Sequence, residues 1–327
     1  MPTPLRVVEV HRDRVTVRVA DGLRSLFVPY GLLAPDGLPV TVGDWVVAST
    51  EGERVDEVRE RRTLIRRRAV GGSAALQPIA ANVDTLFVVT SCNDDFNPSR
   101  LERYLALARE SRVRVVIVLT KRDLSAEPET FEQRARELGQ ALDVVALDAT
   151  SAASVAQLSP WLAAGQSVAF AGSSGVGKST LVNTLLRGDV QRTAGIREDD
   201  SRGRHTTTSR RLFTLPQGAC VIDTPGMREL ETAVTEAEVL DDVFADLALL
   251  ARRCRFRDCA HRGDTGCAIG AAVASGTLDP RRLANYLKLQ READRAARTA
   301  VEQRASDRRF GRMARTVMRD KRRRREE

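Results

Sequence analysis

The sequence predicts a multidomain protein with an N-terminal β-barrel, a central α/β domain and a C-terminal α-helical domain. Three observations support this prediction: short alternating apolar runs at the start, strands alternating with helices in the middle, and a cysteine and histidine cluster ahead of a basic helical tail. A chain of 327 residues is long enough for each domain to bury a core. We expect the domains to span residues 1–68, 69–240 and 241–327.

Strand-like alternation fills the first 68 residues, and the dipeptides Asp21-Gly22 and Asp36-Gly37 provide turn signals. About five short strands without a clear helix favour an oligonucleotide-binding (OB-like) barrel, the commonest small barrel of this length. The alternating apolar residues that predict the strands are Val15, Val17 and Val19, then Leu26 and Val28, Val40 and Val42, and Val46 to Ala48.

The barrel is expected either to bind nucleic acid or to be purely structural, because a fold alone does not define a function. Phe27, Tyr30 and Trp45 are the aromatic residues that could stack on bases. An arginine-rich stretch from Arg59 to Arg68, followed by Gly71-Gly72-Ser73, is expected to form the boundary with the next domain.

The central domain has the pattern of a parallel sheet covered by helices on both faces. Continuous apolar runs predict buried strands, and segments with helical apolar spacing lie between them. We expect strands at residues 85–90, 113–120, 144–147, 167–171, 211–215 and from 220 onward, with helices at 98–111 and 131–142.

A phosphate-binding loop pattern, GxxxxGK[ST], follows the strand at 167–171 and leads into a helical segment. The glycines let backbone N–H groups close around phosphates, Lys178 reaches the outer two phosphates, and the Ser179 hydroxyl ligates Mg²⁺. We therefore expect a nucleotide to be bound by Gly172, Ser173, Ser174, Gly175, Val176, Gly177, Lys178, Ser179 and Thr180.

Thr120-Lys121-Arg122-Asp123 follows the strand at 113–120 and resembles the guanine-specificity motif of GTPases, usually Asn-Lys-x-Asp. By this resemblance Asp123 accepts hydrogen bonds from the guanine base and the Lys121 stem lies along the nucleotide, while Thr120 replaces asparagine. Adenine has no such paired donors, so the carboxylate selects GTP. One strand later, Asp148 and Ala149 occupy the position where GTPases carry a Ser-Ala pair, and aspartate in place of serine makes this the poorest match.

Two further segments provide candidate ligands for Mg²⁺ and the γ-phosphate. Thr206 or Thr207, with Thr207 preferred, would ligate Mg²⁺ from a switch loop that the γ-phosphate orders. Asp223 ends a strand in an Asp-x-x-Gly motif and would hold the same ion, while the Gly226 N–H would meet the γ-phosphate. Methionine at position 227 cannot orient water by hydrogen bonding, so intrinsic turnover is expected to be slow.

The order of these motifs resembles the family of ribosome small-subunit-dependent GTPase A, whose GTPase domain is circularly permuted. The guanine motif precedes the phosphate loop, Arg-His-Thr-Thr-Thr and Asp-Thr-Pro-Gly follow it, and a barrel and a Cys/His cluster flank the domain. The resemblance implies hydrolysis of GTP that the small ribosomal subunit stimulates, and a role in late maturation of that subunit. It also implies that His205 is a candidate for positioning the attacking water.

Three cysteines and a histidine within fourteen residues form the ligand set of a closed structural zinc site. The spacing Cys-x4-Cys-x-His-x5-Cys is not that of the common zinc finger, but it matches the family pattern. We expect one structural Zn²⁺ bound by Cys254, Cys259, His261 and Cys267.

The net charge of +8 is concentrated in the tail, where residues 281–327 carry seventeen Lys/Arg against seven Asp/Glu. Asp279 and Pro280 are expected to begin a helix there. The excess of positive charge favours contact with ribosomal RNA, although a solvated charged helix is the alternative. No apolar run is long enough to cross a membrane and no signal peptide is evident, so we expect a cytoplasmic protein, and a monomer.

The predicted activity is thus hydrolysis of GTP to GDP and phosphate. Two other functions remain open on these residues. One is a P-loop ATPase or small-molecule kinase, against which Asp123 argues. The other is an RNA-binding adaptor that uses the nucleotide as a structural ligand with little catalysis.

Overall fold

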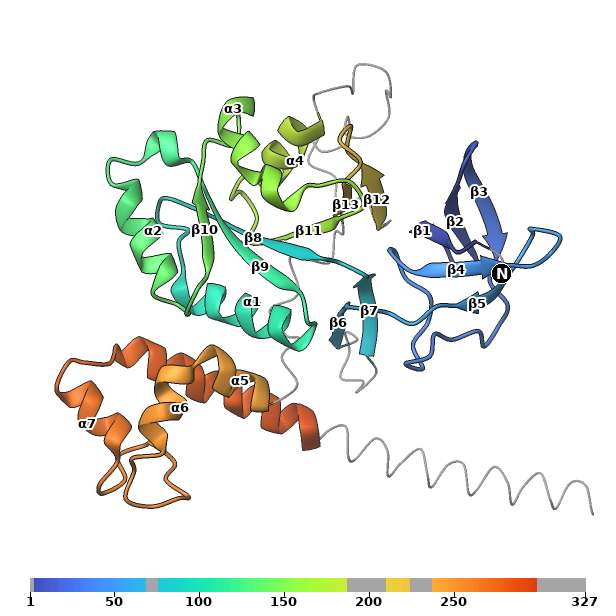
Figure 1. Ribbon diagram of the computed structural model, residues 1–327. Coiled ribbons are helices and arrows are strands. Elements are labelled where there is room, and N and C mark those ends of the chain that lie inside the picture. Colours follow the sequence, from blue (N-terminus) through green and yellow to red (C-terminus); the bar gives the residue numbers. More distant parts are fainter. Residues whose placement is uncertain (1–2, 69–75, 187–209, 224–236, 299–327) are drawn as a thin grey trace, which may run out of the picture. The chain divides into compact units, whose positions relative to one another are not determined.

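The computed structural model describes residues 3–68, 76–186, 210–223 and 237–298. The chain divides into two compact units, of which the first comprises residues 1–67 and 76–233 and the second comprises 68–75 and 234–327 (Figure 1). The first unit holds both the predicted barrel and the sheet that carries the phosphate loop. The second holds the Cys/His cluster.

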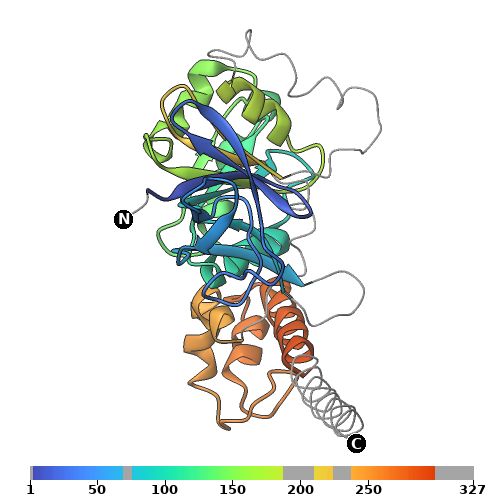
Figure 2. The same cartoon turned by 90° about the vertical axis from the view of Figure 1, so that its right-hand side faces the viewer.

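Five strands form the N-terminal part of the first unit (Figure 2). Strand β1 pairs with β2 and with β4, β2 pairs with β3, and β4 pairs with β5, all antiparallel. A parallel bridge between Phe27 and Arg54 joins β3 to the chain just ahead of β5 and completes the ring. The strands are β1 (Leu5–Val10), β2 (Arg14–Val19), β3 (Gly22–Phe27), β4 (Trp45–Ala48) and β5 (Val55–Val58).

Successive side chains of a strand point to opposite faces, so every second residue points into this ring. The fully buried residues there are Val7, Val15, Val17, Leu26 and Val46. The strand expected at Val40 and Val42 was wrong, because both residues are buried but lie in a loop between β3 and β4. The loop is held instead by the buried Asp44, whose carboxylate accepts a hydrogen bond from the Thr41 N–H at 2.8 Å.

The central sheet has the order β10-β9-β8-β11-β13-β12. The first five strands run parallel and β12 is antiparallel to β13. The predicted strands are confirmed to within two residues as β8 (Thr85–Ser91), β9 (Arg114–Thr120), β10 (Asp143–Ala146), β11 (Ser167–Ala171), β12 (Arg211–Thr214) and β13 (Cys220–Asp223). The strands β6 (Leu64–Arg68) and β7 (Leu76–Ala81) form a separate pair.

Helices cover both faces of this sheet (Figure 1). Helix α1 (Pro98–Glu110) and helix α2 (Pro128–Arg136) pack against β8, β9 and β10, while α3 (Ala152–Val155), the short helix η2 (Ala156–Trp161) and α4 (Lys178–Leu186) bury their apolar residues on the other face. Helix α1 agrees with its prediction. Helix α2 begins three residues before and ends six residues before the predicted bounds of 131–142. The predicted range includes Ala141, whose φ of +54° is incompatible with a right-handed helix.

The barrel and the central sheet are joined by a buried arginine and a strand pairing. Arg6 on β1 is 8% exposed and donates to the Ser167 Oγ at 2.9 Å and to the Asn82 carbonyl oxygen at 3.2 Å. Strand β1 also pairs with β12 at Glu9 and Arg211, whose side chains form an ion pair at 3.0 Å. Hydrogen bonding therefore runs without interruption from the barrel into the sheet that carries the nucleotide motifs.

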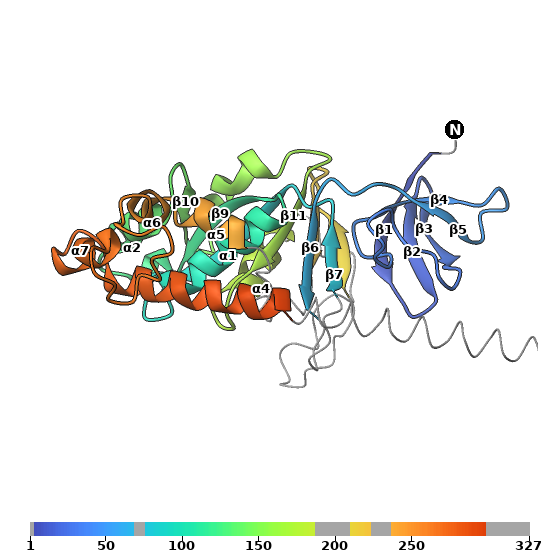
Figure 3. The same cartoon turned by 90° about the horizontal axis from the view of Figure 1, so that it is seen from below.

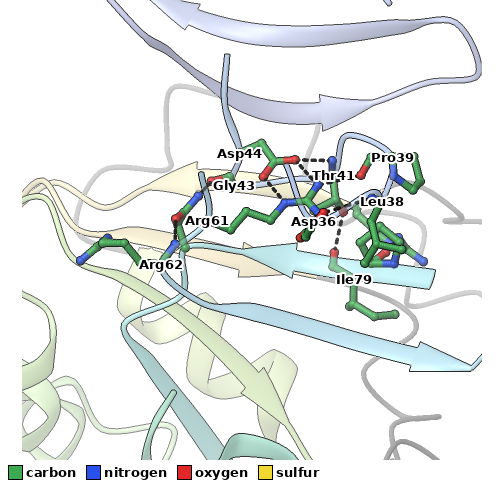
Figure 4. A network of polar contacts seen from close by, with 12 residues as sticks. Asp36, Leu38, Pro39, Thr41, Gly43, Asp44, Arg61, Arg62 and Ile79 are labelled. Carbon is green, nitrogen blue, oxygen red and sulfur yellow. Dashed lines mark hydrogen bonds and ion pairs between the residues drawn. The ribbon is translucent and has the colours of Figure 1, made fainter. Parts of the chain in front are cut away.

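A second polar network lies at the same junction (Figure 4). The Arg61 side chain is 3% exposed and donates to both oxygens of Asp44, whose side chain is fully buried, and to the carboxylate of Asp36. Next to it, a Cβ on Gly43 would lie 2.2 Å from the carbonyl oxygen of Ala81, so only glycine allows the loop to pack so closely on β7.

The second unit contains the helices α5 (Ala237–Val243), α6 (Ala245–Ala251) and α7 (Ala268–Ala274) and a helix over residues 280–298 (Figure 3). The chain between α6 and α7 consists of turns and loops. As predicted, Asp279 caps the last helix, accepting a hydrogen bond from the Arg281 N–H at 2.8 Å. Arg282 donates two hydrogen bonds of 2.7 Å to Asp246 and lies over the Phe244 ring. In the described parts of the chain, no helix combines the length and the apolar character needed to span a bilayer.

Candidate functional site

The phosphate loop lies between β11 and the start of α4, the order that the sequence predicts. Gly172 has a φ of +141°, and a Cβ there would lie 2.1 Å from the carbonyl oxygen of Val89, so the loop requires glycine at its first position. The Lys178 ammonium donates to the carbonyl oxygen of Gly172 at 2.8 Å and to that of Ser173. Ser174 and Gly175 at the tip are exposed.

The other predicted segments come to the same edge of the sheet, because β8, β9, β10, β11 and β13 are parallel and their carboxyl ends meet there. Strands β8 and β11 are neighbours, and the chain leaves β8 toward β9 on one side and β11 toward β13 on the other side of the sheet. Open α/β sheets bind ligands at such a point.

Thr120 is the last residue of β9 and is fully buried. Its hydroxyl lies 2.5 Å from the carbonyl oxygen of Val176 in the phosphate loop and 3.1 Å from that of Thr90. The residue directly after it, Lys121, has a left-handed backbone with a φ of +57°, and its ammonium lies 3.7 Å from Asp95. Asp123 follows in the short helix η1 (Arg122–Leu124) and is exposed.

The loop after β10 lies against the helix that follows the phosphate loop. The Thr184 hydroxyl on α4 donates to the carbonyl oxygen of Ala149 at 2.7 Å. The Asp148 carboxylate accepts from the hydroxyl and the N–H of Thr150, and these hydrogen bonds lower the pKa of Asp148 below its usual range. Asp148 therefore organises its own loop.

The candidate Mg²⁺ ligands are only partly within the described residues. Asp223 is the last residue of β13 and pairs across the sheet with Arg211, and Ser179 is half-buried in the first turn of α4. A hydroxyl and a carboxylate are the oxygen donors that Mg²⁺ prefers. His205, Thr206, Thr207, Gly226 and Met227 lie outside the described residues.

The four ligand atoms of Cys254, Cys259, His261 and Cys267 lie within 4.8 Å of one another. A tetrahedral zinc ion with bonds of about 2.3 Å to sulfur and about 2.1 Å to nitrogen needs sulfur–nitrogen edges of about 3.6 Å. The His261 Nδ1 lies 3.6 Å from the Cys254 sulfur and 3.5 Å from the Cys267 sulfur. The donor set and its spacing therefore fit zinc.

The backbone around this cluster is also arranged for sulfur ligands. His261 has a φ of +56°, a conformation that non-glycine residues adopt only where the surroundings impose it. The Ala268 N–H donates to the Cys254 sulfur at 3.4 Å and the Gly270 N–H donates to the Cys267 sulfur at 3.2 Å. Although burial acts in the other direction, backbone N–H groups lower the pKa of Cys254, which favours the thiolate that a metal requires.

Sequence reasoning missed two residues that contact the loops of the candidate nucleotide site. Arg100 on α1 donates to the Ser173 hydroxyl, and Thr184 contacts the loop after β10. Neither position carries a local signal, since an arginine near a helix start and a threonine inside a helix are ordinary residues there.

A family model described as RsgA GTPase matches residues 58–233 of this chain. The chain is 51% identical over 282 residues to a protein of Vibrio vulnificus (strain CMCP6) named small ribosomal subunit biogenesis GTPase RsgA 2, an alignment that covers 86% of this chain and 80% of that protein. It is 48% identical over 299 residues to small ribosomal subunit biogenesis GTPase RsgA of Xylella fastidiosa (strain 9a5c), covering 90% of this chain and 86% of that one.

Two solved structures resemble the fold over most of its length. The crystal structure of YjeQ from Thermotoga maritima superposes with a TM-score of 0.63 at 26% identity, covering 90% of this chain and 99% of that chain. YloQ, described as a circularly permuted GTPase, superposes with a TM-score of 0.60 at 25% identity, covering 90% and 96%. The permuted arrangement predicted from the order of the motifs is confirmed by these neighbours.

Proposed function

Because this chain belongs to the RsgA GTPase family, we propose that it hydrolyses GTP to GDP and phosphate during biogenesis of the small ribosomal subunit. The observation that carries the proposal is the meeting of a complete phosphate loop with the Lys-x-Asp segment at one edge of the sheet, joined by the contact between Thr120 and Val176. A GTPase needs a phosphate-binding loop and a guanine-selective carboxylate close enough to bind the same nucleotide.

The phosphate loop residues Gly172 to Thr180 bind the nucleotide phosphates in this proposal. Lys178 now donates to two loop carbonyl groups, and it exchanges them for the outer phosphates when GTP binds, where its charge stabilises the transition state. The amides of the loop and of the first turn of α4 point toward the same anion.

Guanine is recognised by Asp123, which is exposed and so available to the N1 and N2 donors of the base. Lys121 lies along the nucleotide, and Ala149 supports the base through its backbone. Thr120 and Asp148, which depart from the usual GTPase residues, act on the protein's own backbone rather than on the base, as their hydrogen bonds suggest.

Ser179, Asp223 and Thr207 are the residues we propose to hold Mg²⁺, which stabilises the charge that develops on the phosphates. Gly226 meets the γ-phosphate through its N–H, and His205 positions the attacking water. Since methionine at position 227 cannot orient water, the ribosomal particle is proposed to complete or order this part of the site.

We also propose that Cys254, Cys259, His261 and Cys267 hold one structural Zn²⁺. The closeness of the four ligand atoms and the two sulfur–nitrogen distances support this, and three thiolates with one imidazole leave no open position for hydrolytic chemistry. The ion stabilises a segment, 252–267, that is too short to form a core of its own.

The N-terminal ring is proposed to be an OB-like barrel. Its strand order, β1-β2-β3-β5-β4 with β4 returning to β1, and the parallel bridge at Phe27 and Arg54 support this assignment. We propose a three-domain organisation with the barrel at 1–68, the GTPase domain at 69–240 and the zinc domain at 241–327. The protein acts as a cytoplasmic monomer on the small subunit and its RNA, to which the basic tail adds phosphate contacts.

GTP turnover with and without purified small ribosomal subunits, measured across a series of salt concentrations, tests this function. We expect slow intrinsic turnover and strong stimulation that falls steeply with ionic strength, because contacts to phosphates release counterions. Turnover that the subunits leave unchanged at every salt concentration would contradict the proposal.

Two variants separate the alternatives in the same assay. Asp123→Ala should lose its preference for GTP over ATP by about tenfold or more, since hydrogen bonds to a charged group contribute about 1.5–3 kcal/mol. An unchanged preference would favour an ATPase or small-molecule kinase. Lys178→Ala should lose turnover and the dependence of ribosome binding on the nucleotide; if the unaltered protein binds ribosomes equally with every nucleotide, the adaptor function is favoured.

A further inference from the structure

We propose that Thr184 is a positioning residue which, together with the Thr120 contact described above, holds the two base-binding loops at a fixed distance from the phosphate loop. This inference rests on the proposed function, since it assumes that one nucleotide occupies both ends of the site. It assigns a role to Thr184, which no nucleotide motif includes.

The Thr120 link joins the end of β9 to the phosphate loop. The hydroxyl is fully buried, and its single proton is shared between the carbonyl oxygens of Val176 and Thr90, at 2.5 Å and 3.1 Å. A Cβ on Gly177 would lie 3.4 Å from the same hydroxyl oxygen, so the threonine also fits closely against the loop backbone. Lys121 and Asp123 follow within three residues, so the link fixes where the base-recognition segment begins.

The Thr184 link joins the loop after β10 to α4. Its hydroxyl donates to the carbonyl oxygen of Ala149 at 2.7 Å, and Ala149 is itself 6% exposed. Thr184 lies six residues after Lys178 on the helix that begins at the phosphate loop, so the position of this loop follows that of the helix.

Both links use main-chain carbonyl groups as acceptors, so the link can be removed by changing the threonine alone. Valine has nearly the shape of threonine and lacks the hydroxyl, and serine keeps the hydroxyl and lacks the methyl group. Each valine variant leaves every group proposed to contact the nucleotide in place, apart from the base-segment residue Thr120 itself.

A ligand held at two ends gains affinity from the fixed separation of the two subsites, because binding one end places the other. A small change in that separation lowers the affinity for the whole nucleotide much more than the affinity for either end alone. A positioning role therefore predicts a loss of affinity for GDP without a matching loss for a ligand that occupies only the phosphate loop.

The test is isothermal titration of GDP, IDP and pyrophosphate, each with Mg²⁺, into the full-length protein and its Thr120→Val, Thr184→Val, Thr120→Ser and Thr184→Ser variants. We expect each valine variant to lose affinity for GDP at least tenfold and to keep its affinity for pyrophosphate within about twofold. The ratio of GDP to IDP affinity, which reports the contact to the 2-amino group of guanine, should fall toward one. The serine variants should remain within about threefold of the unaltered protein.

Thr130→Val is the matched control, because Thr130 is an exposed threonine on α2 in the same unit, and it should bind all three ligands as the unaltered protein does. GDP affinity that the valine variants retain would overturn the proposal. An equal loss for GDP and pyrophosphate would also overturn it, since that result indicates general damage to the phosphate loop.

Thr184 is only partly buried, so we expect Thr184→Val to fold. Its affinities for GDP and pyrophosphate therefore test the positioning role even if Thr120→Val fails to fold. Failure of the proposed function would be seen differently: the unaltered protein would then bind GDP no better than ADP.

Discussion

Arg61 illustrates how much a single side chain can contribute to stability at the junction of the barrel and the sheet. Its side chain is 3% exposed and pairs with Asp44, whose side chain is fully buried (Figure 4). The Arg54 side chain, on the same barrel, is 60% exposed and pairs with the exposed Asp56. Removing one partner of a buried pair leaves an uncompensated charge in a medium of low polarity, whereas an exposed pair is replaced by water.

Arg61→Met should therefore destabilise the first unit by about 3–5 kcal/mol, and Arg54→Met, the matched control, by less than about 1 kcal/mol. Both tryptophans of the chain, Trp45 and Trp161, lie in this unit, so urea unfolding followed by tryptophan fluorescence reports on it. Equal midpoints for the two variants would contradict this account of the network.

Arg282 and Asp246 provide a residue-scale prediction about pH in the second unit. Burial alone would raise the pKa of Asp246, but the hydrogen bonds and charge of Arg282 outweigh it, so the pKa is lowered. A carboxyl group whose folded pKa is lowered contributes stability that is present above its unfolded pKa of about 3.9, and this stability is lost as the pH falls through the folded value.

Arg282→Met should therefore weaken protection of the α6 amides at pH 7 by the equivalent of about 1 kcal/mol, a modest value because the Asp246 side chain is 44% exposed. Hydrogen exchange of residues 247–251 measures this, with variant and unaltered protein compared at each pH. The difference should shrink below about pH 4. In an Asp246→Asn background the effect of Arg282→Met should not vary with pH, and a variation there would argue against the ion pair as its cause.

At the scale of elements, the segment from Cys254 to Cys267 has few buried apolar side chains; Cys267 alone among its residues is buried. Its conformation, including the left-handed backbone at His261, therefore depends on what joins its four ligand residues. Helix α7 begins directly after Cys267 and uses that residue as its N-cap.

Zinc removal should thus loosen the second unit while the first remains folded. We expect one equivalent of zinc in the purified protein and its loss in Cys259→Ser, with faster hydrogen exchange in residues 268–274 and unchanged tryptophan fluorescence. Cys220→Ser, which alters a cysteine far from the cluster in sequence, is the control and should retain the metal. Full zinc content in Cys259→Ser would show that this cysteine is not a ligand.

Across the whole molecule, features with a local sequence signature could be predicted, whereas features that depend on long-range contacts could not. The strand at 167–171, the phosphate loop and the Cys/His cluster have signatures within a few residues, so the sequence predicts them well. Val40 and Val42 alternate like a strand, yet a buried carboxylate holds them in a loop, and nothing local distinguishes the two cases. Composition also could not distinguish Arg61, whose side chain is 3% exposed, from Arg59, whose side chain is 38% exposed.

The contact of β1 with β12 matters for how a ribosome makes this chain. Glu9 and Arg211 are 202 positions apart, and Arg6 lies 161 positions from Ser167, so the barrel strands emerge long before these partners are synthesised. The nascent barrel can close without β12, because β1 pairs with β2 and β4 within the barrel. Until β12 is made, part of β1 has unpaired backbone groups at an open edge, where another chain could associate. The carboxylate of Glu9 lies on that edge, so the growing polypeptide shields itself with a charge that later becomes half of an ion pair.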